Sequence, residues 1–200
     1  MVELRDEFGG EVEIDYRFVS VFGSAREKLE ERWRDKGGLA GYGEHVRGIV
    51  AGFGHVLVHD DVWTRVSPAS SWPAHLVLSA VRRLEREGTA PAGACAALAH
   101  SLRQAFFGEA RDIASQDVLL AAVEALGIEP AAVVAELSSG RAHAELAADY
   151  ERAREQDVRM SPTLLMNDGR QRLSGNVGYR VIASNVREVL EKRADQVSWC

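Results

Sequence analysis

The chain has 200 residues, of which 46% are hydrophobic and 27% charged, a balance typical of a folded globular protein and unlike that of a disordered or fibrous one. Its 30 acidic and 24 basic residues give a net charge of −6, so it lacks the broad basic surface that binds nucleic acids or anionic lipids. We therefore expect neither nucleic acid nor a membrane among its partners.

The start of the chain carries charges where a signal peptide needs an apolar run, and no stretch approaches the ~18 apolar residues of a membrane span. These features predict a cytoplasmic protein. The two cysteines, Cys95 and Cys200, are too few for a disulfide framework and are not clustered as zinc ligands are. We expect no disulfide between them and no resident metal or cofactor.

Two elements are predicted before residue 20. Leu4 and Phe8 lie four residues apart in a charged stretch that ends at Gly9 and Gly10, the pattern of the last turns of a helix with a glycine stop. Apolar residues then alternate with charged ones, which predicts a strand over Val12–Phe18 with one buried face. This strand is the clearest in the sequence.

From Ser24 to about Gly140 the apolar residues follow helical spacing, and interruptions by glycine and proline predict five or six helices. Ser71 precedes Trp72–Pro73 and an apolar stripe, so it is expected to cap the N-terminus of one of them. Three stripes are expected to form core: Leu76, Val77, Ala80, Val81 and Leu84; Leu98, Leu102, Ala105 and Phe106; Val118, Leu119, Ala122, Val123 and Leu126. The β-branched patch at residues 55–59 is a candidate extended segment.

The last sixty residues predict a helix, a turn, a hairpin and a final helix. The first helix runs from Ala142 to about Gln156, and the backbone must leave it at Ser161–Pro162–Thr163. A hairpin pairs Leu164–Met166 with residues 170–174, because Asp-Gly supplies the positive φ angles of a tight turn. The closing helix carries its apolar stripe from Val181 to Leu190.

Three segments resemble the DsbA-like thioredoxin proteins. Gly140–Asn167 followed by Leu173–Gly175 is similar to their C-terminal half, in which a helix, a Val-x-x-(Val/Ser)-Pro-Thr turn, a hairpin and a last helix follow in order. Ser70–His75 and Leu102–Ile113 resemble two segments of the helical domain that is inserted into that fold. The resemblance spans roughly Glu11 to Leu190 and is strongest after Ser101.

The resemblance implies an α/β thioredoxin-like fold with an all-helical insertion. Residues 1–22 and 141–200 would form the discontinuous thioredoxin-like domain, and residues 23–140 the insertion. The relatives include disulfide oxidoreductases, 2-hydroxychromene-2-carboxylate isomerases and kappa-class glutathione transferases, which work with thiols or glutathione. A full-length form of this protein is therefore expected to act on protein disulfides or on a glutathione-linked substrate, with a thiol or disulfide peptide or a small thiol such as glutathione as its partner.

The same resemblance implies the site. Pro162 would be the cis-proline that faces the active site, and Ser161 the residue whose backbone groups pair with a bound peptide or glutathione like an added strand. Thr163, Ser71 and His75 complete the implied substrate-binding residues. Ser71 and His75 also have purely structural explanations, helix capping for the first and ordinary burial for the second.

One part of the family pattern is missing from the chain. Family members carry Cys-x-x-Cys or a serine at the start of the first helix, where the helix N-terminus stabilises a thiolate. This sequence has neither that motif nor the strand before it, so no catalytic residue is assigned and the nucleophile is expected before Met1. A truncated gene model, a strand supplied by a partner and a different sheet remain open, as do a redox-inactive binding module and a homodimer with exchanged strands.

Other candidate motifs are weaker. A metal site could draw enough ligands from four neighbouring residues, His55, His59, Asp60 and Asp61. Their spacing across an apolar run arises as easily by accident, and we predict no metal there. The glycines of residues 175–180 precede a helix without the spacing of a phosphate-binding loop, which predicts an ordinary turn. The thiol of Cys200 is expected to be exposed but unable to cycle as a dithiol does.

Overall fold

The computed structural model describes residues 2–20, 22–53 and 57–191. They form two compact units: unit 1 comprises Met1–Val19 and Glu151–Cys200, and unit 2 comprises Ser20–Tyr150. The domain boundaries predicted from the sequence stay a prediction, because compactness alone does not define an inserted domain.

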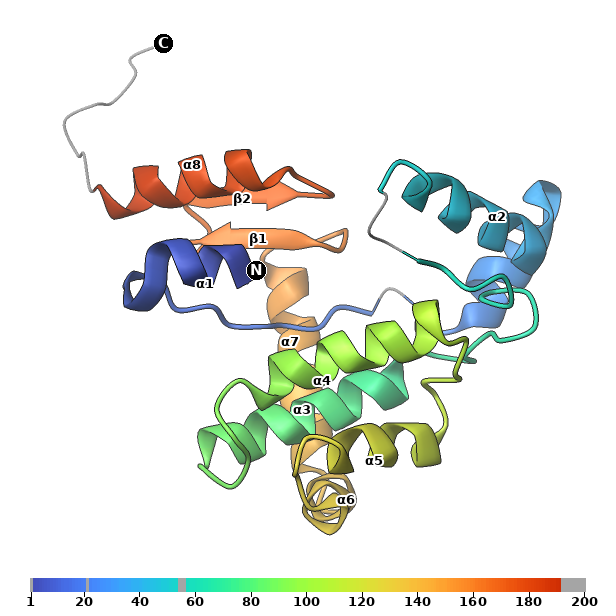
Figure 1. The fold of residues 1–200 in the computed structure, drawn as a ribbon, viewed down its shortest axis with the longest axis horizontal. Coiled ribbons are helices and arrows are strands. Elements are labelled where there is room, and N and C mark those ends of the chain that lie inside the picture. Colours follow the sequence, from blue (N-terminus) through green and yellow to red (C-terminus); the bar gives the residue numbers. More distant parts are fainter. Residues whose placement is uncertain (1, 21, 54–56, 192–200) are drawn as a thin grey trace. The chain divides into compact units, whose positions relative to one another are not determined.

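Unit 1 is built around a β-hairpin (Figure 1). Strand β1 (Thr163–Met166) pairs antiparallel with β2 (Gln171–Ser174), so that Thr163 lies opposite Ser174 and Met166 opposite Gln171. The turn between them has positive φ angles of 47°, 53° and 92° at Asn167, Asp168 and Gly169, a conformation that asparagine, aspartate and glycine tolerate best. The predicted hairpin is confirmed.

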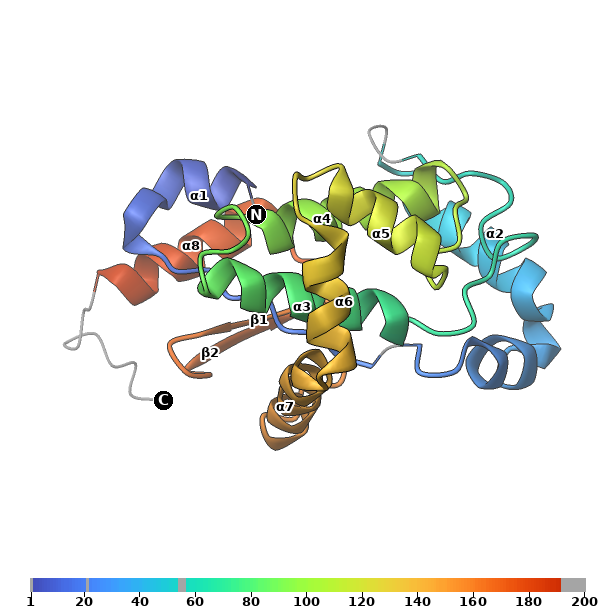
Figure 2. The ribbon, with the colours of Figure 1, turned by 90° about the horizontal axis from the view of Figure 1, so that it is seen from below.

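Two helices cover the hairpin. Leu4 and Phe8 of α1 (Val2–Phe8) pack against Ala183 and Val186 of α8 (Tyr179–Leu190), and the partly buried Met166 of β1 joins this core (Figures 1 and 2). A polar clamp supplements it, since the Tyr179 hydroxyl donates to the Glu7 carboxylate and Arg187 pairs with the same group. The short 3₁₀ turn η1 (Gly9–Glu11) follows α1. The helix end at Phe8 and the closing helix were both correctly predicted.

The predicted strand over Val12–Phe18 is wrong. The backbone is extended at Val12, with φ −126° and ψ 121°, and burial alternates along the segment, but the sheet of the described residues contains only β1 and β2. Alternation reports that one face is buried, whereas a strand also needs a hydrogen-bonded neighbour. Val12 and Ile14 obtain their burial from the core beneath α1 and α8 instead.

Unit 2 is helical, as predicted. Its chain forms η2 (Arg26–Glu31), η3 (Arg34–Lys36), α2 (Gly38–Val50), α3 (Trp72–Arg86), α4 (Ala94–Arg103), η4 (Gln104–Gly108), α5 (Gln116–Glu124) and α6 (Pro130–Ser138). Helix α7 (Arg141–Glu155) begins in unit 2 and ends in unit 1. His55 and Val56 of the candidate extended patch lie outside the described residues, and residues 57–59 belong to no helix or strand.

Helix α3 lies at the centre of the core of unit 2, packed against α4 and α6 (Figures 1 and 2). Ala80 and Val81 on α3, Leu98 on α4 and Val123 on α5 are fully buried, so the predicted stripes do form core. A second, aromatic core lies beside η2, where the ring of Trp63 stacks 5.1 Å from Phe22 and meets Phe106 edge-on at 5.0 Å.

A carboxylate from α3 caps the start of α4. Glu85 accepts the backbone N–H groups of Gly93 at 2.6 Å and Cys95 at 2.9 Å, which a helix N-terminus otherwise leaves unpaired. We predict that Glu85→Ala lowers the free energy of unfolding by about 1–3 kcal/mol, measured by urea denaturation. Glu124→Ala, on an exposed residue at the end of α5, is the control and should change it by less than about 0.5 kcal/mol.

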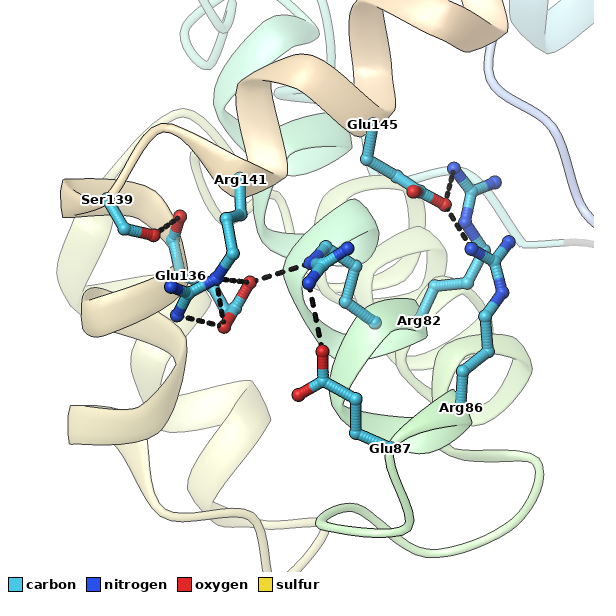
Figure 3. Close-up of polar contacts among 8 residues, drawn as sticks. Arg82, Arg86, Glu87, Glu136, Ser139, Arg141 and Glu145 are labelled. Carbon is cyan, nitrogen blue, oxygen red and sulfur yellow. Dashed lines mark hydrogen bonds and ion pairs between the residues drawn. The ribbon is translucent and has the colours of Figure 1, made fainter.

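Ion pairs that involve the buried residues Arg82 and Glu136 tie α3 to α6 and α7 (Figure 3). The Glu136 carboxylate accepts hydrogen bonds from Arg141 at 2.6 Å and from Arg83 at 2.8 Å. These two bonds hold the pKa of Glu136 below its usual value. Arg82, only 5% exposed, places Nη2 2.9 Å from Oε1 of Glu145 and 2.8 Å from Oδ2 of Asp149. These pairs link α3, which carries His75, to α6 and α7.

Candidate functional site

The Ser161–Pro162–Thr163 segment leads directly into β1. The Ser161–Pro162 peptide bond is cis, and both residues are exposed. The Pro162 carbonyl accepts the Gly175 N–H at 2.8 Å, and the Thr163 hydroxyl donates to the Met160 carbonyl at 2.8 Å. These two bonds hold the segment in place at the open end of the hairpin.

Ser161 differs from its neighbours in having no hydrogen-bond partner among the residues that the structure describes. Its backbone N–H and C=O are therefore available to a ligand. The three consecutive apolar residues of β1, Leu164–Met166, are typical of a strand that is covered on both faces, yet within the described chain β1 pairs only with β2. An extended ligand can bond to such free backbone groups as an added strand does.

Ser71 lies at the predicted N-cap position of α3 but forms no capping hydrogen bond. Its φ and ψ of −81° and −10° are helical, and a capping hydroxyl reaches the first-turn N–H groups from an extended residue. The Ser71 hydroxyl instead lies 3.2 Å from the Phe22 carbonyl, to which the Ser71 N–H also donates at 2.9 Å. The Trp72 N–H donates to the Ser70 hydroxyl at 3.1 Å, so the expected capping by Ser71 is wrong.

His75, one turn further along α3, is partly buried and pairs with Tyr150 of α7. Its Nδ1 lies 3.1 Å from the Tyr150 hydroxyl. Burial lowers the pKa of His75 to about 4, against the opposing effect of the Asp149 carboxylate, so the imidazole is neutral at pH 7. Burial likewise raises the pKa of Tyr150 to about 12, which keeps the phenol protonated. The pair is therefore uncharged at neutral pH.

Trp72, Ser20 and Tyr150 were missed by the sequence analysis. The indole Nε1–H of Trp72 donates to the Ser20 hydroxyl at 3.0 Å, and its ring lies 5.6 Å from the Tyr150 ring. The hydroxyl of Ser20 in turn bonds to Tyr150. These residues come from three separate segments, and no local motif links them. Of the predicted site residues, Ser71 and His75 thus lie with this cluster in unit 2, and Ser161–Thr163 lie in unit 1.

The weaker candidates gain no support. Within the described ranges, no group of three histidine, cysteine, aspartate or glutamate side chains could hold a metal ion. His55 and Cys200 lie outside these ranges, and His59 accepts the Asp61 N–H at 3.1 Å. The thiol of Cys95 is buried and lies 3.6 Å from the Leu78 carbonyl. Over the same part of the chain, no helix is both long and apolar enough to span a bilayer.

Comparison with known proteins identifies the family of the chain. The family model of the DSBA-like thioredoxin domain matches residues 80–187, from α3 to α8. A search of curated proteins finds no match. Among solved structures, the chain is similar to a putative protein disulfide isomerase from Nitrosomonas europaea, with 20% identity, a TM-score of 0.58, and coverage of 74% of this chain and 69% of that one. The predicted thioredoxin-like fold with a helical insertion is confirmed, and the chain belongs to the family of DSBA-like thioredoxin domains.

Proposed function

We propose that the protein acts in thiol–disulfide exchange, on protein disulfides or on a glutathione-linked substrate, and that this chain supplies the surface on which the substrate docks. The observation that carries the proposal is Ser161, an exposed residue two positions before β1 whose backbone has no hydrogen-bond partner among the described residues. A peptide or glutathione laid along it can donate to the Ser161 carbonyl and accept from its N–H.

In the exchange itself, a thiolate sulfur attacks one sulfur of the substrate disulfide, forms a mixed disulfide and releases the other sulfur as a thiolate. Cys95 is unsuited to this step because it is 5% exposed and lies in the core of α4. The sequence contains no Cys-x-x-Cys. We therefore assign the attacking thiolate to a residue outside these 200. Thr163 in unit 1, and Ser71 and His75 in unit 2, stay predicted substrate-binding residues.

The test compares two forms of the protein in an assay with an oxidised fluorescent peptide. The 200-residue chain is expected to show no exchange above the rate in buffer. A form extended from the upstream reading frame, provided that this encodes a strand followed by Cys-x-x-Cys or Cys-x-x-Ser, is expected to be active and to lose activity when the first cysteine is replaced by alanine. Activity in neither form would refute the proposal.

A second candidate, a redox-inactive module that binds peptides or partners, is favoured by the absence of a dithiol motif from the chain. The two candidates share the docking surface and differ upstream, where the inactive module requires no cysteine codons. A homodimer in which a second copy supplies a strand to β1 is the third alternative. Light scattering at increasing protein concentration separates it, since a monomer throughout excludes strand exchange.

A further inference from the structure

Strand β1 has an outer edge, opposite the edge that pairs with β2. The Pro162 carbonyl accepts the Gly175 N–H at 2.8 Å, so these two residues form a hydrogen-bonded pair of the antiparallel ladder. Thr163 follows in register, opposite Ser174, and Leu165 lies two residues further along β1. Hydrogen-bonded pairs alternate with pairs that exchange no bonds. The backbone N–H and C=O groups of Thr163 and Leu165 therefore face away from β2, along the outer edge.

No backbone group of the described chain pairs with this outer edge. The backbone groups of Thr163 and Leu165 have no hydrogen-bond partner among the described residues besides β2, and the same holds for the backbone of Ser161. Exposed edges are commonly protected from pairing by charged side chains. The residues of β1, Thr163–Met166, carry no charge. The outer edge is therefore suited to pairing with a further strand.

Both faces of β1 carry apolar groups beside the outer edge. Met166 packs against the core of α1 and α8, and strand alternation places Leu164 on the same face. Leu165 and the methyl group of Thr163 lie on the opposite face. Met160, which is 52% exposed, adds a flexible thioether just before the docking segment. A strand added here gains most from apolar side chains opposite these residues.

We infer that the outer edge of β1 binds an extended, apolar peptide segment as a third strand, in continuation of the docking backbone of Ser161. All of these residues lie in unit 1. The distance from Ser161 to Leu165 is roughly 13 Å at about 3.3 Å per residue, which a segment of about five residues matches. Glutathione is shorter and carries no apolar side chain. The inference rests on the proposed function and narrows its substrate class to disulfides within apolar polypeptide segments.

The experiment titrates the chain with a labelled peptide, Val-Leu-Cys-Val-Leu with its cysteine alkylated, and with glutathione alkylated in the same way. Two further versions of the peptide carry N-methyl groups, one at its second and fourth residues and the other at its third and fifth. In an added strand only one of these sets of amides faces β1. One version is therefore expected to bind at least about tenfold more weakly than the parent peptide, and the other to bind like it. Glutathione should bind more weakly than the parent peptide.

Proline substitutions test the same pairing from the side of the protein. Leu165→Pro removes an N–H of the outer edge and should weaken binding of the parent peptide about fivefold. Ser174→Pro is the matched control. Ser174 lies opposite Thr163, so its N–H faces the far edge of β2, and its loss should leave binding unchanged. Thermal unfolding shows whether each variant keeps its fold, and the methylated peptides provide the test on the unchanged protein.

Several outcomes would overturn the inference. Equal weakening by both sets of methyl groups would show that no strand is added. Tighter binding of glutathione than of the peptide would assign the docking backbone to small thiols. A dimer that the peptide does not dissociate, seen by light scattering, would mean that a second copy occupies the edge. Loss of peptide binding in the extended form of the protein would mean that its additional residues occupy it.

The proposed function has a separate readout in the exchange assay. If neither form of the protein exchanges disulfides but the peptide binds with the expected alternation, the strand site stands and the proposed chemistry fails. If exchange is observed but the alternation is absent, the chemistry stands and the added strand is refuted. Binding of no probe contradicts the docking surface itself.

Discussion

Replacing Asp149 by alanine is expected to lower the free energy of unfolding by about 3 kcal/mol. Asp149 is 1% exposed, and its Oδ2 lies 2.8 Å from the guanidinium of Arg82, which is itself 5% exposed. Removal of the carboxylate leaves a buried cation that has lost one of its two acidic partners. Glu145, at 2.9 Å, remains, which puts the loss at the lower end of the range of about 3–5 kcal/mol for a broken buried pair.

Urea denaturation measures this loss of stability. Two further variants test whether it arises from the broken buried ion pair. Glu30→Ala removes a carboxylate that is 53% exposed and lies 3.7 Å from Arg26, so it should cost less than about 1 kcal/mol. The double variant Arg82→Met with Asp149→Leu should recover much of the stability, because apolar residues of similar volume often replace a buried ion pair without loss. A cost below about 1 kcal/mol for Asp149→Ala would show that the pair is solvated in solution.

The sequence could predict what depends on neighbours along the chain. The stripe of α3 repeats at helical spacing, and the hairpin has Asp168 and Gly169 in its turn, so both elements follow from local pattern. The Pro162–Thr163 pair of the candidate site is likewise visible in the local sequence, because it lies between a helix and an apolar strand. The segment Val12–Phe18 was misjudged because its alternation is local, whereas the hydrogen bonds of a strand depend on distant residues.

The unpredicted part of the site depends on tertiary contacts. Arg82 and Asp149 are 67 residues apart in sequence, and each resembles an ordinary charge on a solvated helix face until α3 and α7 are brought together. The Trp72–Ser20 bond spans 52 residues and the His75–Tyr150 bond spans 75. No spacing rule along one helix relates such residues, so the cluster could be found only from the structure.

Acid is expected to destabilise the protein through His75. In the unfolded chain this histidine takes up a proton near pH 6.5, whereas burial keeps its pKa at about 4 in the folded protein. Between these values the unfolded state binds more protons, so stability falls as the pH falls, and below about pH 4 the loss stops growing. The shift corresponds to a loss of about 3 kcal/mol at pH 4 relative to pH 7.

The variant His75→Phe isolates this contribution. Between pH 7 and pH 4, the unfolding free energy of this variant should fall by about 2–3 kcal/mol less than that of the unchanged protein. This difference does not depend on the stability that the variant loses at pH 7 because its hydrogen bond to Tyr150 is missing. Protonation of carboxylates such as Glu136 also destabilises the protein in acid, but it does so equally in both proteins. The control variant His100→Gln, at an exposed residue of α4, should keep the pH dependence of the unchanged protein. An unchanged slope in His75→Phe would mean that His75 gains its proton in the folded protein as readily as in the unfolded one.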